Sequence, residues 1–231
     1  MVLELHEKTG RKYSLILNGE KYCRCYPGDL RGLGFAGLAV GQETEVTGEA
    51  LAEFERTVFL PRAKRRSLML LGKKEYTSRE MTKKLMTDGY PEAVTEAVLS
   101  WLADLHYVDD FSYAERYAFS LLSRHSEREI QQKMQQKGLD RELIKDALVA
   151  AKDRYREEHT GSGMNGENGD GGLEFSAEQE AIRTVLRKKG YRPEAMEAEK
   201  KQKLVMSLYR KGFSLSDIQT VIGEFEGDVE F

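Results

Sequence analysis

The chain has few of the residues that mark secreted, membrane or metal-stabilised proteins. Its 231 residues include only two cysteines, four histidines, four prolines and one tryptophan. No apolar run approaches the roughly 18 residues that a membrane-spanning helix needs. The first residues do not combine a basic stretch with an apolar one, so we expect no signal peptide. These features favour a cytoplasmic protein with no attachment to a membrane.

Cysteine is too scarce for a disulfide framework. Cys23 and Cys25 are two positions apart, so on a strand both side chains would point to the same face. A zinc site would need two further ligands at a suitable spacing. A disulfide at this spacing is disfavoured in a cytosolic chain. The pattern therefore favours two small side chains on one strand.

The sequence also lacks the usual motifs of catalysis. Neither HExxH nor GxSxG occurs, and glycines 32 to 41 lack the Gly-Lys-Ser/Thr ending of a phosphate loop. Asp109 and Asp110 precede a predicted helix, where capping is favoured over a metal pair. The histidines fall in different predicted elements, and His106 fits a helix-end cap: His6, His106, His125 and His159. We therefore predict no catalytic, cofactor or metal site.

Residues 1 to 60 have a β-rich pattern that the rest of the chain lacks. Two runs rich in β-forming residues, 12 to 17 and 20 to 26, flank the dipeptide Asn18-Gly19. Asn-Gly between such runs is the strongest short-range signal for a hairpin. A glycine-punctuated loop follows, and a short helix begins at Thr47. We predict a small β-containing module here.

From residue 61 onward a helical pattern repeats. Residues 77 to 90 align without a gap with residues 126 to 139, and residues 203 to 213 form a more divergent third copy. The first two copies begin with a predicted capping box, Thr77 with Glu80 and Ser126 with Glu129. An apolar pair spaced i, i+4 follows in each copy. Each copy then ends in a glycine suited to a left-handed helix stop: Gly89, Gly138 and Gly212.

A further predicted helix precedes and follows each copy, and the first of these helices is predicted to start at Pro61. The fold class is therefore mainly α, with tandem three-helix repeats in three units and a small N-terminal module that contains a β-hairpin. The predicted domains are residues 1–60, 61–108, 109–159 and 176–231. A polar, glycine-rich tract at 160–175 is predicted to be a flexible linker, because it cannot bury apolar surface.

Basic residues cluster although the net charge is −3. An acidic total counts against a dedicated nucleic-acid binder. For any single residue a solvated face is the plain interpretation, but recurrence across the units favours a shared acidic or phosphate-bearing partner. Trp101 is predicted to pack in the core rather than to stack on a base. The candidate partner-binding residues are Arg65, Arg66, Lys83, Lys84, Arg128, Lys133, Lys137, Arg187, Lys188, Lys189, Arg210 and Lys211.

The most specific segments are residues 78 to 90, the Tyr107 to Tyr117 stretch, residues 128 to 138 and residues 201 to 214. In this order they resemble the RecX family, over about residues 10 to 225 apart from the 160–176 tract. The glycine-rich tract is a departure from the family pattern.

The resemblance implies a monomeric, non-enzymatic regulatory protein without a cofactor. It implies binding to the RecA filament, inhibition of RecA recombinase and ATPase activity, and weak contact with DNA. Such a protein would modulate DNA recombination, DNA repair and the SOS response. A helical DNA-binding protein, or a helical adaptor without RecA specificity, is the alternative.

Overall fold

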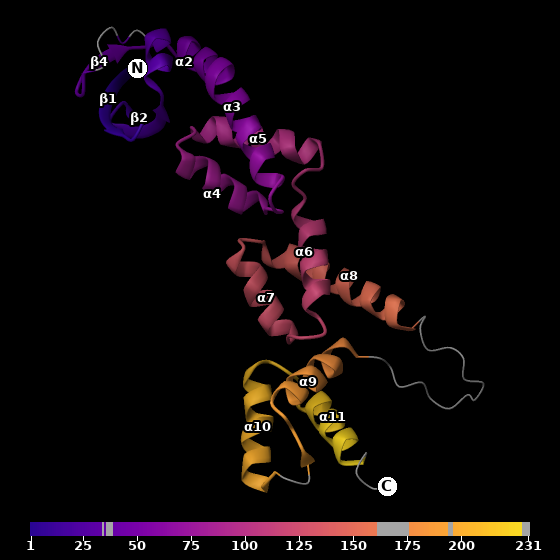
Figure 1. Ribbon diagram of the computed structural model, residues 1–231. Helices are drawn as coiled ribbons and strands as arrows, with labels where there is room; N and C mark the ends of the chain where they lie inside the picture. The colour runs from indigo at the N-terminus through magenta and orange to yellow at the C-terminus, as the bar shows by residue number, and fades with distance from the viewer. Residues whose placement is uncertain (34, 36–38, 161–175, 194–195, 228–231) are drawn as a thin grey trace. The chain divides into compact units, whose positions relative to one another are not determined.

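The structure is a computed structural model that describes residues 1–33, 35, 39–160, 176–193 and 196–227 (Figure 1). The chain divides into two compact units, Met1–Asp109 and Asp110–Phe231. The mainly helical prediction with tandem three-helix repeats and an N-terminal β module is confirmed.

The first unit opens with a four-stranded antiparallel sheet in the order β3-β2-β1-β4. The predicted hairpin is confirmed as β2 and β3, and Asn18 and Gly19 both have positive φ, 49° and 87°, as the hairpin turn requires. The sheet is larger than this hairpin, because β1 and β4 flank it. The strands are β1 (Val2–Thr9), β2 (Lys12–Leu17), β3 (Glu20–Cys25) and β4 (Glu43–Glu45).

The two cysteines lie on β3 as predicted, and both are buried free thiols. Burial, with Asp29 as a lesser cause, raises the pKa of the Cys25 thiol to about 12. Burial likewise raises the pKa of Cys23 well above its ordinary value. Both thiols are therefore protonated at neutral pH and belong to the apolar core.

The prediction that a helix starts at Pro61 is wrong. The backbone is helical from Gly48 onward, through α2 (Gly48–Phe54), the π-helical turn η2 (Glu55–Phe59) and α3 (Leu60–Leu71). Pro61 has no N–H and would clash with a carbonyl in the preceding turn of a regular helix. The wide π turn, in which Leu60 N–H bonds to Glu55 O, precedes the proline and lets the helix continue.

The sheet and the first three-helix repeat share one core. Side chains from strands and helices, such as Leu3, Phe59, Met81 and Leu102, belong to the same buried cluster. The domain boundary predicted at residue 60 therefore lies within a continuous helical segment. Residues on both sides of this position belong to the same core. The remaining elements of this unit are α1 (Pro27–Leu30), η1 (Arg31–Leu33), α4 (Ser78–Asp88) and α5 (Glu92–Asp104).

The second unit contains two three-helix groups with separate buried clusters. The first consists of α6 (Asp110–Leu121), α7 (Glu127–Gln136) and α8 (Arg141–Thr160). The second consists of α9 (Ala177–Lys188), α10 (Ala198–Arg210) and α11 (Leu215–Gly227). The predicted linker lies outside the described residues, except for Thr160 at the end of α8.

The predicted helix starts and stops are confirmed with one correction. Gly89, Gly138 and Gly212 have φ values of 94°, 84° and 98°. The capping box of Thr77 and Glu80 is complete. At α7 only the hydroxyl half is seen, since Ser126 Oγ accepts from Glu129 N–H. The Glu129 carboxylate contacts His125 instead, at 3.1 Å.

Candidate partner-binding surface

The first repeat carries exposed lysines on α4. Lys83 and Lys84 are exposed, whereas Met81 and Leu85 on the same helix are completely buried. The i, i+4 apolar stripe turns toward the core, so the lysines that lie off it point to solvent. On α3, Arg65 is exposed, but Arg66 pairs with Asp88, Nε to Oδ2, at 2.7 Å. Arg66 therefore joins α3 to the end of α4.

The second repeat places Lys137 against aromatic rings. Its Nζ lies 5.4 Å from the centre of the Tyr113 ring and 5.3 Å from that of Tyr117. These rings stack with their centres 5.9 Å apart. Lys133 is half-buried and Arg128 is exposed, both on α7. Cation–π contact holds Lys137 on the surface of its own repeat.

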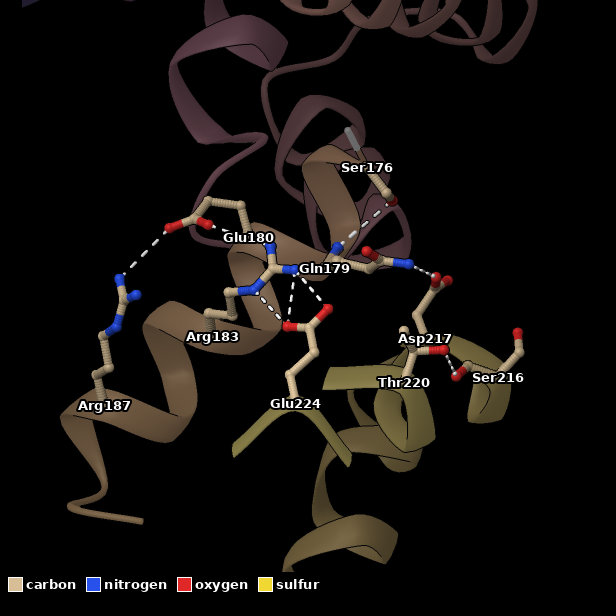
Figure 2. Close-up of polar contacts among 9 residues, drawn as sticks. All are labelled: Ser176, Gln179, Glu180, Arg183, Arg187, Ser216, Asp217, Thr220 and Glu224. Atoms are coloured by element: carbon tan, nitrogen blue, oxygen red, sulfur yellow. Dashed lines mark hydrogen bonds and ion pairs between the residues drawn. The ribbon is translucent and has the colours of Figure 1, made fainter. Parts of the chain in front are cut away.

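In the third repeat most candidate cations have partners within the protein. Arg187 lies 3.6 Å from Glu180, a pair drawn in Figure 2. Lys189 Nζ lies 3.4 Å from Ser207 Oγ, and Arg210 Nε donates to the Met206 carbonyl at 3.3 Å. Exposed pairs of this kind contribute less than about 1 kcal/mol, so these cations can exchange partners.

The twelve candidates thus separate into two groups. Some have side-chain contacts that fix them within the protein. The side chains of the others form no hydrogen bond or ion pair within the described part of the chain. The second group, called the free cations below, comprises Arg65, Lys83, Lys84, Arg128, Lys133 and Lys188. They lie on α3, α4, α7 and α9, so each repeat offers at least one.

The outer face of α10 was missed in the sequence analysis. Met206 and Tyr209 keep 47% and 50% of their surface exposed, beside Arg210. Large apolar side chains at this exposure are candidates for contact with a partner. A signal was present, because both residues lie off the i, i+4 stripe formed by Leu204 and Leu208.

The other residues discussed in the sequence analysis lie at helix ends or against the core. His106 takes a left-handed φ of 56° at the end of α5, where its N–H bonds to Ala103 O, so the helix-end prediction is confirmed. Asp109 directly precedes α6, and Asp110 is the first residue of that helix. Trp101 is half-buried against the core, and Lys64 Nζ lies 4.5 Å from the centre of its ring.

A cavity of about 470 Å³ in the second unit offers a different kind of site. Charged side chains of both signs line it, including Glu127, Lys152, Glu178 and Asp217. Burial, followed by the nearby Asp217, raises the pKa of Glu178. The mixed charges select neither anions nor cations. Among the described residues, no group of three or more metal-ligating side chains comes together.

Helices and units of this kind define a class of protein, namely a tandem three-helix-repeat protein with exposed basic residues. Within the described residues, no helix is long and apolar enough to cross a membrane. Three family domains match the chain in order. The first three-helix domain of RecX matches residues 63–102, the second matches residues 109–148, and the third matches residues 177–222.

These matches together take in more than half of the chain, which belongs to the RecX family. The regulatory protein RecX of Clostridium tetani is 23% identical over 96% of this chain and 92% of its own length. That of Caldanaerobacter subterraneus subsp. tengcongensis is 24% identical over 94% of this chain and 95% of its own.

A crystal structure of regulatory protein RecX supports the fold. It superimposes with a TM-score of 0.54 at 21% identity, over 96% of this chain and 99% of that one. The three domain matches confirm the sequence resemblance to the family.

Proposed function

We propose that this protein binds the RecA filament and inhibits RecA recombinase and ATPase activity, without an enzymatic activity of its own. The observation that carries the proposal is the ordered match of three RecX domains, together with the similarity of almost the whole chain to proteins named regulatory protein RecX. A role in recombination, repair and the SOS response follows from the partner. Because RecA works on DNA inside the cell, the proposal also implies a cytoplasmic protein, and we propose that it acts as a monomer.

The free cations support an acidic or phosphate-bearing partner. Lys83 and Lys84 are exposed on α4, and their side chains form no ion pair with any described residue, so binding would break no ion pair among those residues. Charge-assisted hydrogen bonds from such ammonium groups are among the stronger polar contacts.

The presence of basic residues in each of the three repeats is suited to binding a polymeric partner. A filament presents the same surface at each protomer, and linked units can contact several protomers at once. Linked contacts raise the overall affinity even where each is weak. The exposed Met206 and Tyr209 on α10 would add apolar contact area at the third repeat.

The test is charge reversal of the α4 lysines. We expect Lys83→Glu/Lys84→Glu to raise the concentration that half-inhibits RecA's DNA-dependent ATPase on the order of tenfold, which corresponds to 1.4 kcal/mol. The matched control is Lys200→Glu/Lys203→Glu, with the same charge change. These control lysines already pair with Glu197 and Glu199, at 3.3 and 2.6 Å. Thermal melting should change little in either variant, because exposed charges contribute less than about 1 kcal/mol.

Two results would count against the proposal in different ways. Full inhibition by the α4 variant would reject Lys83 and Lys84 as binding residues. No effect of the unmodified protein on RecA would reject the function itself. Salt-dependent binding to DNA, without an effect on RecA, would then favour the alternative of a DNA-binding helical protein.

A further inference from the structure

The end of α10 lies against the beginning of α7, and one hydroxyl connects them. Ser126 Oγ accepts the Glu129 N–H at 3.2 Å, which caps α7, and it donates to the Lys211 carbonyl at 2.5 Å. Lys211 is the C-cap residue of α10. The partly negative end of one helix thus lies at the partly positive start of the other. Lys211 Nζ adds a contact to Glu129 at 3.7 Å.

Gly212 makes this approach close. A Cβ at position 212 would lie 2.7 Å from Arg128 Cβ and 3.3 Å from Ser126 Oγ. The Arg128 Cβ is fixed by its helix and cannot move away as a side-chain tip can. Gly190 ends α9 with a positive φ of 64°, yet a Cβ there would have no neighbour within 4 Å. Chain reversal alone therefore does not require such close packing.

The first unit uses the same arrangement at Gly89. Arg24 on β3 donates its N–H to Gly89 O at 2.8 Å, and a Cβ at Gly89 would lie 2.6 Å from Arg24 Cβ. The Arg24 guanidinium also bonds to Thr87 O, and Lys12 Nζ bonds to Asp88 O. In both units, the side-chain stem of an arginine on an earlier element lies against a left-handed glycine at a helix end.

The repeats on either side of the Gly212 contact have separate cores. The buried cluster of α6 to α8 shares no residue with that of α9 to α11. Within the described residues, Ala177 is the one hydrophobic side chain of α9–α11 that packs against the first cluster, and polar side chains such as Glu178 and Asp217 line the cavity beside it. The third repeat also has polar contacts of its own. Arg183 on α9 donates two hydrogen bonds to Glu224 on α11, both at 2.9 Å (Figure 2).

We propose that Ser126, Arg128 and Gly212 form a docking joint that fixes the third repeat on the second. Breaking this joint releases the third repeat as a folded body. Its core and its internal ion pairs do not depend on the joint, so release changes the orientation of the repeat and not its fold. The joint would set the orientation of the exposed α10 face relative to α7, independently of whether the partner is RecA.

The experiment measures the distance between the two repeats in the full chain. Spin labels are placed at the exposed positions Gln132 on α7 and Gln202 on α10, each changed to cysteine, since the native cysteines are buried. Double electron–electron resonance measures the distance between the two spin labels. In the otherwise unmodified protein it should give a narrow distance distribution. We expect Gly212→Ala to broaden and shift this distribution while the far-ultraviolet circular dichroism stays unchanged.

Matched variants separate docking from backbone strain. Gly190→Ala introduces the same kind of left-handed strain in open space, and it should leave the distribution narrow. Adding Arg128→Gly to Gly212→Ala removes the Cβ that the new methyl group would meet, and it should restore the narrow distribution. An equal effect of Gly190→Ala and Gly212→Ala, or no restoration by Arg128→Gly, would overturn the proposed joint.

A second pair keeps the test decisive if Gly212→Ala fails to fold. Ser126→Asp and Ser126→Asn are nearly isosteric, and both residues cap helix N-termini well. Only asparagine can still donate a hydrogen bond to Lys211 O. We expect Ser126→Asp to broaden the distance distribution and Ser126→Asn to keep it narrow. A narrow distribution in the aspartate variant would contradict the proposal.

Discussion

Replacing Gly89 with alanine should destabilise the first unit more than the same replacement at a left-handed glycine that has no close neighbour. Gly89 has a φ of 94°, and the left-handed conformation costs a residue with a Cβ about 1–2 kcal/mol. The new Cβ would also lie 2.6 Å from Arg24 Cβ, and such crowding typically costs a further 1–3 kcal/mol or so. We therefore expect a loss of about 2–5 kcal/mol in the free energy of unfolding.

Gly41 provides the control for strain alone. Its φ is 84°, and a Cβ there would have no neighbour within 4 Å. Gly41→Ala should therefore cost only about 1–2 kcal/mol. The assay is urea unfolding followed by the fluorescence of Trp101, the single tryptophan, which packs against the core of this unit. Equal losses for Gly89→Ala and Gly41→Ala would refute the close-packing argument.

Three further predictions concern stability and reactivity. Glu178→Gln should stabilise the second unit at neutral pH, because burial and Asp217 raise the pKa of Glu178 and so penalise its charged form. That gain should shrink as the pH falls through the folded-state pKa, where the native carboxyl takes up its proton; a gain constant from pH 4 to 8 in urea titrations would contradict the assignment. Cys23 and Cys25 should react with iodoacetamide slowly in the native protein and rapidly in urea, whereas fast native alkylation would show that the thiols are accessible. Gly138→Val should lower the melting temperature by a strain of about 1 kcal/mol or more, and an unchanged melting curve would reject Gly138 as a left-handed stop.

The parts of the fold that depend on local chemistry could be predicted from the sequence. Asn18-Gly19 fixes a hairpin, and the capping box of Thr77 marks a helix start, because each acts through atoms a few residues apart. Strand β1 was not predicted, although Leu3 and Leu5 alternate with polar residues as on a half-buried strand. Pro61 was misread because proline favours a first helical turn, and the sequence gives little warning of the π turn that admits it.

The candidate surface could be predicted only in part, for a similar reason. Basic residues off an apolar stripe are recognisable from spacing, and Lys83 and Lys84 are exposed as that spacing indicates. Which cations are already engaged depends on residues distant in the sequence. Arg66 pairs with Asp88, and Lys211 lies near Glu129 across two repeats, so neither contact could be read from spacing.

The most direct test of the proposed function is binding to RecA itself. The unmodified protein is sedimented with ATP-bound RecA filaments on single-stranded DNA, and in parallel with the same DNA alone at the same salt concentration. We expect the protein to sediment with the filaments at concentrations where it inhibits RecA ATPase and where little sediments with bare DNA. Equal binding to bare DNA and to filaments, with RecA ATPase unaffected, would contradict the proposal.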